Sequence, residues 1–433
     1  MAPVRPLLHP APVLRLRPSH PRPYGLQRPG GPGGVLTSPL FQPGRIGRLE
    51  LPNRLVRSAT YEAMADEAGV PSEHYDELYR KLAAGGVGLI ITGHTYVARD
   101  GKMPKMCGID RDDLVPRYRT VTDLVHGLGG RIAMQINHGG AEANTRESGF
   151  VPLSPSPTRS TMTGLKSRAM TEEEIGRIAR DFGSAARRAR EAGFDAVQVH
   201  GAHAYLVCQF LTEASNRRDD GWGGSREGRL RFLRRVYDEV RGAVGPDFPV
   251  LVKMSLYDLR GHRGLSLEEG VELAVAAAGM GFDAIEASCG TPAERLSIVR
   301  GRHPVRAALE AGGPGQDRPA PGVVSGMSVP PVTFSEAYNR EAARALKARV
   351  TVPVLVVGGY VNPATMEDVI RAGDADFVSM SRALIMRPDW PNRLAAGDRE
   401  PVKCLHCNHC LFFTGSTYTR CHYGRPLAEQ GIA

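Results

Sequence analysis

In the stretch "FDAVQVHGAHAYLVCQFL", residues 194–211, an apolar run ends in two histidines and a tyrosine within six positions. Its segment "AVQVHG" is short and β-branched, which is typical of a buried strand. Longer helical patterns separate it from seven similar runs: "RLVRSAT" (54–60), "GLIITG" (88–93), "RIAMQIN" (131–137), "PVLVKMS" (249–255), "AIEASCG" (284–290), "PVLVVGG" (353–359) and "DFVSMS" (376–381). Eight alternating strands and helices predict an α/β fold, the closed (β/α)8 TIM barrel.

The helical patterns between these runs support the same fold. We expect helices over 72–85, 171–193, 266–279 and 335–349, and the second and third of them begin with a Thr or Ser cap followed by glutamates. A doubly wound open sheet is the alternative, but it usually carries a G-x-G-x-x-G turn after its first strand, and the sequence has none there. The long connections 138–171 and 291–333 follow the third and sixth strands, so we expect them to form lids on the catalytic face.

Composition and charge narrow the class of protein. The 433 residues are 42% hydrophobic, which suits an enzyme-sized globular chain. The sequence contains no run of eighteen apolar residues, the length needed to span a bilayer. The net charge of +9 is concentrated in residues 1–35, which hold five arginines and no acid, so the rest of the chain carries 50 basic against 46 acidic side chains. We therefore expect a cytoplasmic protein that binds neither nucleic acid nor membrane.

Three segments differ in composition. Residues 1–36 are rich in Pro, Arg and Gly and have no periodic apolar face, which predicts a disordered tail. Residues 37–400 form the expected barrel, and 401–433 form a Cys-rich extension. The break near Val35 leaves two hypotheses open: translation begins at Val35 from an alternative codon, or the tail is a genuine disordered extension.

Polar and glycine residues follow most of the predicted strands. Catalytic groups of barrel enzymes come from such strand ends, and a glycine pair after the seventh strand with Ser and Arg after the eighth is typical of a phosphate site. A lysine inside an apolar strand needs a partner, because a buried ammonium is costly. Single histidines at strand ends are often supporting residues, and the glycine pair is also explained by an ordinary turn. The candidates are Ser58, Thr60, Gln135, His138, His200, His203, Lys253, Gly358, Gly359, Ser381 and Arg382.

Six motifs in order, "NRLVRSAT", "GLIITG", "QINHGG", "VHGAHAYLVCQFLTEASNRRDDGWGGSREGRLRF", "VGGY" and "SMSRALIMRPDWPNRL", give the chain a family resemblance over roughly residues 37–425. It resembles the Old Yellow Enzyme family of FMN-dependent ene reductases. The resemblance implies FMN at the barrel mouth, with Lys253 at the pyrimidine edge, where a cation favours reduced flavin. It also implies that the flavin ring is held by Ser58, Ala59, Thr60 and Gln135, and the phosphate by Gly358, Gly359, Ser381 and Arg382.

The same resemblance assigns the catalytic residues. His200 and His203 would hydrogen-bond the carbonyl oxygen of an α,β-unsaturated small-molecule substrate, hydride would come from flavin N5, and NAD(P)H would be the reductant. Tyr205 would protonate the α-carbon, because a tyrosine stays protonated at neutral pH. Two alternatives stay open: a related flavin barrel acting oxidatively, in amine demethylation or desaturation, and a non-catalytic redox- or metal-sensing module.

The sequence departs from the family pattern at four positions. Ala141 stands where the family often has the arginine of "H-x-G-R", and Ala204 changes the commoner "HGYL" to "HAYL". Tyr61 and His94 occupy positions near the flavin that usually hold other residue types. Because of Ala141, Tyr61 and His94, the resemblance alone does not fix the flavin potential or the substrate, whereas Ala204 only adds one methyl group beside Tyr205.

Four clustered cysteines, Cys404, Cys407, Cys410 and Cys421, are spaced C-x2-C-x2-C-x10-C. The spacing is similar to the iron–sulfur motif of 2,4-dienoyl-CoA and 2-enoate reductases, though one residue tighter. Such thiols suit a 4Fe-4S cluster or zinc, and free thiols remain an alternative. Those relatives continue into a second flavin and a nicotinamide module, so this chain would take hydride directly from NAD(P)H or use a separate electron-donor protein. Whether it forms a homo-oligomer stays open.

Deleting residues 1–34 tests the proposed boundary of the barrel. We expect FMN binding, melting temperature and ene reduction to remain unchanged, because the tail has no apolar pattern with which to join a core. Loss of flavin or aggregation of the truncated protein would show that the tail packs on the barrel.

Overall fold

The computed structural model describes residues 38–144, 148–160, 162–261, 264–291, 297–302, 304, 331–415 and 417–424. The chain divides into two units, Met1–Gly33 and Gly34–Ala433, and every described residue belongs to the second. The tail predicted for residues 1–36 and most of the lid expected at 291–333 therefore lie outside the described residues.

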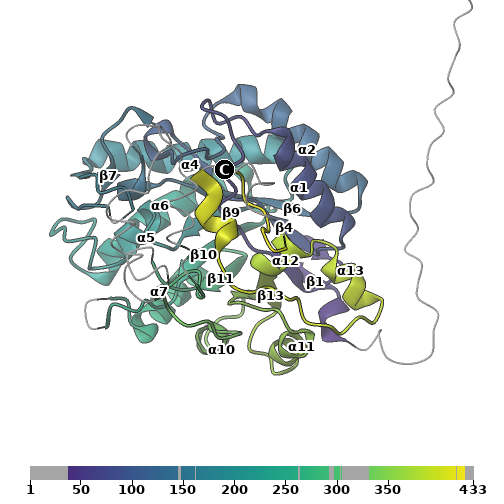
Figure 1. The fold of residues 1–433 in the computed structure, drawn as a ribbon. Coiled ribbons are helices and arrows are strands. Elements are labelled where there is room, and N and C mark those ends of the chain that lie inside the picture. Colours follow the sequence, from purple (N-terminus) through teal and green to yellow (C-terminus); the bar gives the residue numbers. More distant parts are fainter. Residues whose placement is uncertain are drawn as a thin grey trace, which may run out of the picture. The chain divides into compact units, whose positions relative to one another are not determined.

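Eight parallel strands close into a barrel that a ring of helices surrounds (Figure 1). Neighbouring strands pair in chain order, β4 pairs with β6, and β13 pairs back onto β3 to close the sheet. Each of the eight predicted runs contains one of these strands, so the TIM barrel is confirmed and the open-sheet alternative is wrong. The strands are β3 (Leu55–Arg57), β4 (Leu89–Ile91), β6 (Ile132–Asn137), β9 (Ala196–Gly201), β10 (Val250–Ser255), β11 (Ala284–Ser288), β12 (Val354–Val357) and β13 (Phe377–Met380).

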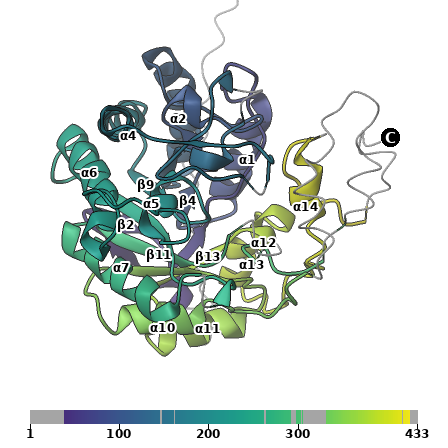
Figure 2. The same cartoon turned by 90° about the vertical axis from the view of Figure 1, so that its left-hand side faces the viewer.

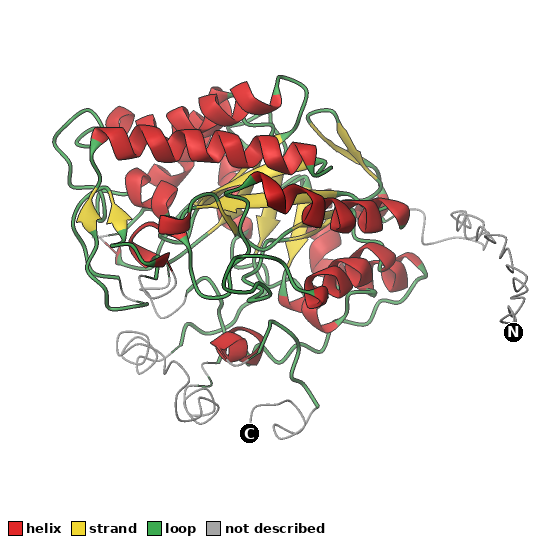
Figure 3. Cartoon of the chain, turned by 90° about the horizontal axis from the view of Figure 1, so that it is seen from above, coloured by secondary structure: helices red, strands yellow, loops and turns green. Residues whose placement is uncertain are grey.

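The described helices are drawn in red in Figure 3. They are α1 (Glu73–Ala84), α2 (Val115–Gly127), α4 (Glu172–Glu191), α5 (Leu206–Leu211), α6 (Arg226–Val244), α7 (Leu267–Met280), α10 (Arg340–Lys347), α11 (Pro363–Arg371), α12 (Arg382–Met386), α13 (Trp390–Ala395) and α14 (His409–Phe412). Thr171 and Glu174 form a reciprocal capping box on α4, and Ser266 caps α7, as their sequences predict. Among the described helices, none is both long enough and apolar enough to cross a membrane.

One predicted helix is shorter than expected. The pattern over 335–349 predicts a helix along its whole length, but α10 begins only at Arg340. Ala337 has a φ of 56°, outside the helical region, and the Glu336 carboxylate accepts hydrogen bonds from the backbone N–H groups of Val361 and Asn362. Tertiary contacts to the loop after β12 therefore replace the first turn of the helix.

Short elements complete the described chain. The hairpin of β1 (Gly44–Ile46) and β2 (Leu49–Leu51) precedes the barrel, β5 (Thr95–Tyr96) pairs beside β6, and β7 (Leu153–Ser154) pairs with β8 (Arg168–Ala169). The 3-10 turns are Pro39–Phe41, Arg99–Gly101, Asp112–Leu114, Gly140–Glu142 and Phe413–Gly415.

The barrel interior changes from apolar to polar along the strands. One buried apolar cluster fills its lower part: Ile46, Leu51, Val56, Leu89, Ile91, Ala133, Ala196, Leu251, Ala284, Leu355 and Phe377. Two residues further along three of these strands, the inward positions hold Gln135, Gln198 and Lys253, and all three side chains are buried. The buried polar and charged side chains inside the barrel therefore lie toward the carboxyl ends of the strands.

A buried ion pair fixes the start of this polar layer. The guanidinium of Arg57 lies 2.6 Å from Glu62, and both side chains are at most 4% exposed. The same carboxylate oxygen of Glu62 accepts hydrogen bonds from the Tyr79 hydroxyl at 2.6 Å and the Gly93 amide at 3.2 Å. These bonds tie the loop after β3 to α1 and to the end of β4.

Replacing Glu62 by Gln tests this tie. We expect a loss of about 3–5 kcal/mol in the free energy of unfolding, because the guanidinium of Arg57 would stay buried without its counter-charge. Urea denaturation followed by circular dichroism measures the change. Glu77→Gln is the matched control, since Glu77 pairs with Arg80 on the surface of α1. Equal loss in both variants would contradict the role of the buried pair.

Candidate active site

Lys253 reaches the polar end of the barrel from β10. Its ammonium donates a hydrogen bond to the Ser58 hydroxyl at 2.8 Å and lies 3.5 Å from the Glu286 carboxylate. Burial lowers the pKa of Lys253, and the negative charge of Glu286 opposes that shift. The sequence predicted that this lysine needs a partner, and Glu286, on the neighbouring strand β11, is the partner that sequence reasoning missed.

His200 and His203 lie side by side at the end of β9, with ring centroids 5.2 Å apart. Burial lowers the pKa of both imidazoles, and nearby positive or imidazole groups lower it further, so both rings are neutral. His200 Nδ1 accepts a hydrogen bond from the Ala202 amide, which leaves the proton of the neutral ring on Nε2. His203 Nε2 lies 2.8 Å from the Ser288 hydroxyl.

Tyr205 lies against the same group of rings. Its centroid is 4.9 Å from that of His200 and 5.1 Å from that of His94. Burial and the charge of Glu142 raise the pKa of the Tyr205 phenol well above its ordinary value. The hydroxyl therefore keeps its proton across the working pH range of most enzymes.

The turn between His203 and Tyr205 explains why the family commonly has glycine where this chain has Ala204. His203 and Ala204 have φ angles of 62° and 61°, in the left-handed region where glycine is favoured. Glycine at position 204 would relieve this conformation, which accounts for the commoner "HGYL". Ala204 keeps the same turn at some cost in backbone strain.

Tyr61 and His94 form one wall of the site. Their rings are stacked with centroids 5.4 Å apart. Burial and the charge of Lys253 lower the pKa of His94 to about 3. In the part of the chain that the structure describes, His94 Nε2 is buried without a hydrogen-bond partner, so a ligand is free to bond it.

The expected phosphate residues gather at the ends of β12 and β13. The Thr60 and Ser381 hydroxyls lie 2.7 Å apart. Gly359 has a φ of 78°, and an added Cβ would lie 2.7 Å from the Phe334 ring, so the turn itself requires glycine there. Arg382 donates one hydrogen bond to the Arg300 carbonyl and one to Asn408, both at 2.7 Å.

The polar groups at the barrel mouth fit FMN. A cation from Lys253 and polar groups from Ser58 and Gln135 face the mouth, and a second cation, Arg382, lies beyond them. The unpartnered Nε2 of His94 shows that polar capacity is left for a ligand.

A scan against family models finds the same relationship. The model described as "NADH:flavin oxidoreductase / NADH oxidase family" matches residues 39–297 and 328–400. The chain belongs to this family. The Old Yellow Enzyme resemblance is thereby confirmed.

Individual relatives give the same family in more detail. The chain is 32% identical to an NADH oxidase of Thermoanaerobacter brockii and 30% identical to a "multifunctional alkene reductase/demethylase OYE" of Caballeronia cordobensis, over 85% and 87% of its length. It spans only about half of each relative, 52% in both cases. An Old Yellow Enzyme homologue of Zymomonas mobilis has the same fold, with a TM-score of 0.69, 24% identity, and coverage of 88% of this chain and 97% of that one.

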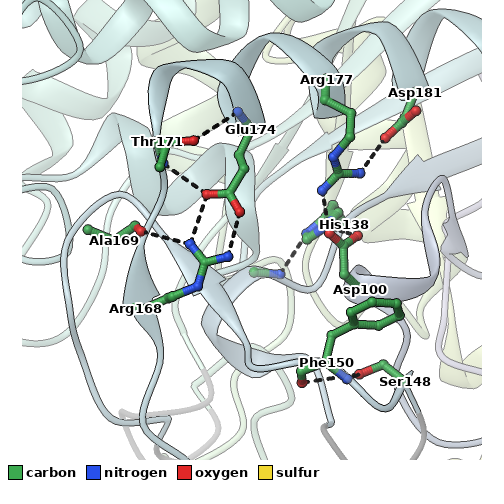
Figure 4. A network of polar contacts seen from close by, with 11 residues as sticks. Asp100, His138, Ser148, Phe150, Arg168, Ala169, Thr171, Glu174, Arg177 and Asp181 are labelled. Carbon is green, nitrogen blue, oxygen red and sulfur yellow. Dashed lines mark hydrogen bonds and ion pairs between the residues drawn. The ribbon is translucent and has the colours of Figure 1, made fainter.

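His138, another strand-end candidate, serves a supporting role. Its Nε2 lies 3.0 Å from Asp100, which also pairs with Arg177, and its Nδ1 accepts the Gly140 amide (Figure 4). Burial would raise the pKa of Asp100, but the bonds from His138 and Arg177 hold it well below its usual range. The network in Figure 4 ties the end of β6 to α4 through Arg177 and Asp181.

The described part of the Cys-rich extension contacts loops that follow the barrel strands, and Figure 2 shows α14 set apart from the ring of helices. Asn408 donates to the carbonyls of Val299 and Arg302, and Thr419 donates to that of Tyr61. Cys404, Cys407, Cys410 and Cys421 are all partly exposed. Within the described ranges, no three His, Cys, Asp or Glu side chains are grouped closely enough to hold a metal ion. The described thiols therefore do not present a formed ligand set for a metal or a cluster.

A hollow of about 740 Å³ opens at the opposite end of the barrel. Its lining includes Arg45, Glu50 and Arg54, and it shares no residue with the site at the mouth. Barrel enzymes place their chemistry at the carboxyl ends of the strands, so we assign no function to this hollow.

Proposed function

We propose that this flavoenzyme uses NAD(P)H to reduce the C=C bond of α,β-unsaturated carbonyl compounds. The observation that carries the proposal is the meeting of two neutral imidazoles, His200 and His203, with the protonated phenol of Tyr205. This set offers hydrogen-bond donors for a carbonyl oxygen and, beside them, an acid for a carbon atom.

The residues that would hold FMN are those at the strand ends. Ser58, Ala59, Thr60 and Gln135 would surround the ring, Lys253 would lie at its pyrimidine edge, and Gly358, Gly359, Ser381 and Arg382 would surround the phosphate. FMN, when bound, supplies hydride from its N5 atom.

His200 and His203 would bind and polarise the substrate. The Nε2–H of His200 would donate to the carbonyl oxygen. His203 would donate beside it through Nδ1–H, with its Nε2 accepting a hydrogen bond from the Ser288 hydroxyl. These bonds stabilise negative charge that develops on oxygen and make the β-carbon electrophilic. Because both imidazoles are neutral, they act as donors and do not protonate the oxygen outright.

Tyr205 would complete the reaction by giving its phenolic proton to the α-carbon. The raised pKa of the phenol keeps the proton available, and the resulting phenolate would be reprotonated from solvent. Burial of Tyr205, which is 7% exposed, limits direct access of water to the α-carbon.

Oxidation of an amine is the second candidate function. The Caballeronia cordobensis relative is named both an alkene reductase and a demethylase. The buried Glu142 carboxylate, whose charge acts on Tyr205, would favour a cationic substrate nearby. Comparing reduction of 2-cyclohexenone with dye reduction driven by dimethylglycine separates the two functions, and we expect the first to be faster.

We propose two sources of electrons for the flavin of this chain, which spans about half the length of several curated relatives. Direct hydride transfer from NAD(P)H needs no further component. A separate electron-donor protein is the alternative source of electrons. Cys404, Cys407, Cys410 and Cys421 are the candidate ligands either for a 4Fe-4S cluster, which would be able to relay electrons, or for zinc, which is redox-inactive and would be structural. Iron, zinc and sulfide analysis of anaerobically purified protein distinguishes these cases.

Two variants test the catalytic roles. His200→Ala should lower turnover about 10²- to 10³-fold, because one donor to the developing oxyanion is lost. Tyr205→Phe should slow reoxidation by 2-cyclohexenone about 10²- to 10⁴-fold and leave flavin reduction by NAD(P)H near normal, because only the proton donor is removed. Stopped-flow absorbance measures each half-reaction separately.

The matched control is Tyr237→Phe, which removes the hydroxyl of a tyrosine on α6 that bonds the Gly281 carbonyl. It should leave both half-reactions unchanged. Equal slowing of both half-reactions in Tyr205→Phe would show that Tyr205 maintains the structure of the site and is not the proton donor.

A further inference from the structure

Three buried side chains inside the barrel form a continuous chain of hydrogen bonds. The amide nitrogen of Gln135, on β6, donates to the amide oxygen of Gln198, on β9, at 2.6 Å. The amide nitrogen of Gln198 donates to Glu286, on β11, at 3.0 Å. All three side chains are at most 1% exposed, so bulk water does not compete for these bonds.

The carboxylate at one end sets the direction of the whole chain. Ionised and paired with Lys253 at 3.5 Å, Glu286 is an acceptor only, so Gln198 must present its NH2 group to it. The amide oxygen of Gln198 then faces Gln135, so Gln135 must donate a hydrogen bond to it from its own NH2 group. The opposite orientation of either amide would bring two acceptors together in a buried site, which is strongly unfavourable.

The consequence appears at the barrel mouth. With its nitrogen committed inward, Gln135 directs its carbonyl oxygen away from Gln198, and no donor to that oxygen is found among the described residues. The pyrimidine edge of a flavin presents the N3–H donor between two carbonyl acceptors. An oxygen of Gln135 matches N3–H, whereas an NH2 group in its place would meet it donor to donor.

We propose that Glu286 is a positioning residue that acts through Gln198 to hold the Gln135 amide in the orientation that accepts N3–H of FMN. The inference rests on the proposed seat of the flavin ring beside Gln135 and Lys253. Glu286 has a second effect through the same carboxylate: it offsets part of the charge that Lys253 brings to the pyrimidine edge.

A purely structural role as counter-ion to Lys253 does not explain all of the arrangement. Lys253 already donates to Ser58 at 2.8 Å, and the second carboxylate oxygen of Glu286 is buried without a hydrogen-bond partner in the described chain. A buried carboxylate oxygen without a hydrogen-bond partner costs free energy. The other carboxylate oxygen of Glu286 accepts from Gln198 and so fixes the orientation of two amides, which a counter-ion role alone does not explain.

Two variants separate the directional effect from the charge effect. Gln198→Leu breaks the chain and leaves the pair of Glu286 and Lys253 in place. Glu286→Gln removes the charge and, being both donor and acceptor, permits either direction of the chain. Asp283→Asn is the matched control, because Asp283 is a carboxylate that precedes the same strand and bonds Arg241 and the Val250 amide.

The readouts are FMN dissociation by fluorescence, the N3–H proton resonance of 15N-labelled FMN, and the flavin reduction potential. Both Gln198→Leu and Glu286→Gln should raise the FMN Kd about tenfold, the size expected for one lost hydrogen bond. Both should shift the N3–H resonance upfield and speed its exchange with solvent. Only Glu286→Gln should also raise the reduction potential of the flavin. Without the negative charge of Glu286, the positive charge of Lys253 stabilises the anionic reduced flavin more strongly.

The outcomes distinguish this inference from the proposed function. Wild-type protein that binds no FMN would overturn the proposed seat of the flavin. The role of Glu286 would be overturned if the wild type protects N3–H from exchange and the Gln198→Leu variant keeps the same N3–H resonance and the same FMN Kd. That result would leave the proposed position of the flavin ring unchanged. If Glu286→Gln fails to fold, Gln198→Leu against Asp283→Asn still decides the question.

Discussion

An ammonium inside a closed barrel is the constraint on which the site depends. The eight strands seal the interior, so the charge of Lys253 must be balanced by groups on neighbouring strands. Glu286 supplies the counter-charge at 3.5 Å and Ser58 a hydrogen bond at 2.8 Å, and both come from strands or strand ends that only the closed sheet brings together. The register that pairs Lys253 with His200 on one side and Glu286 on the other places this charge beside the imidazoles of the candidate site.

The same charge influences the protonation of its neighbours. Burial is the main cause that lowers the pKa values of His94, His200 and His203, and Lys253 contributes to each shift. Tyr205 lies in the same buried group, and burial raises its pKa. One environment thus keeps the imidazoles neutral and the phenol protonated, the two states that polarising a carbonyl and protonating a carbon require.

The fold was largely predictable from the sequence, because each of the eight runs is β-branched and bounded by turn residues or a capped helix. The shortened start of α10 was not predictable, since contacts of Glu336 with the loop after β12 decide it. Gln198 and Glu286 were missed although a signal existed. Each stands two positions before a residue of the site, His200 or Ser288, inside an apolar run, and alternation along a strand places such residues on one face. The bonds between them could not be predicted, because they depend on the register of different strands.

Isotope labelling of the reduced product tests the central claim most directly. The first experiment uses 2-methyl-2-cyclohexenone in H2O with NAD(P)H that carries deuterium at the position of the transferred hydride. The product should then carry deuterium on the β-carbon alone. With unlabelled NAD(P)H in D2O, deuterium should enter the α-carbon on a single face in the wild type, because a positioned Tyr205 delivers it. Deuterium from NAD(P)H at the α-carbon, or α-deuteration on both faces in the wild-type product as first formed, would contradict hydride addition at the β-carbon and proton delivery by Tyr205.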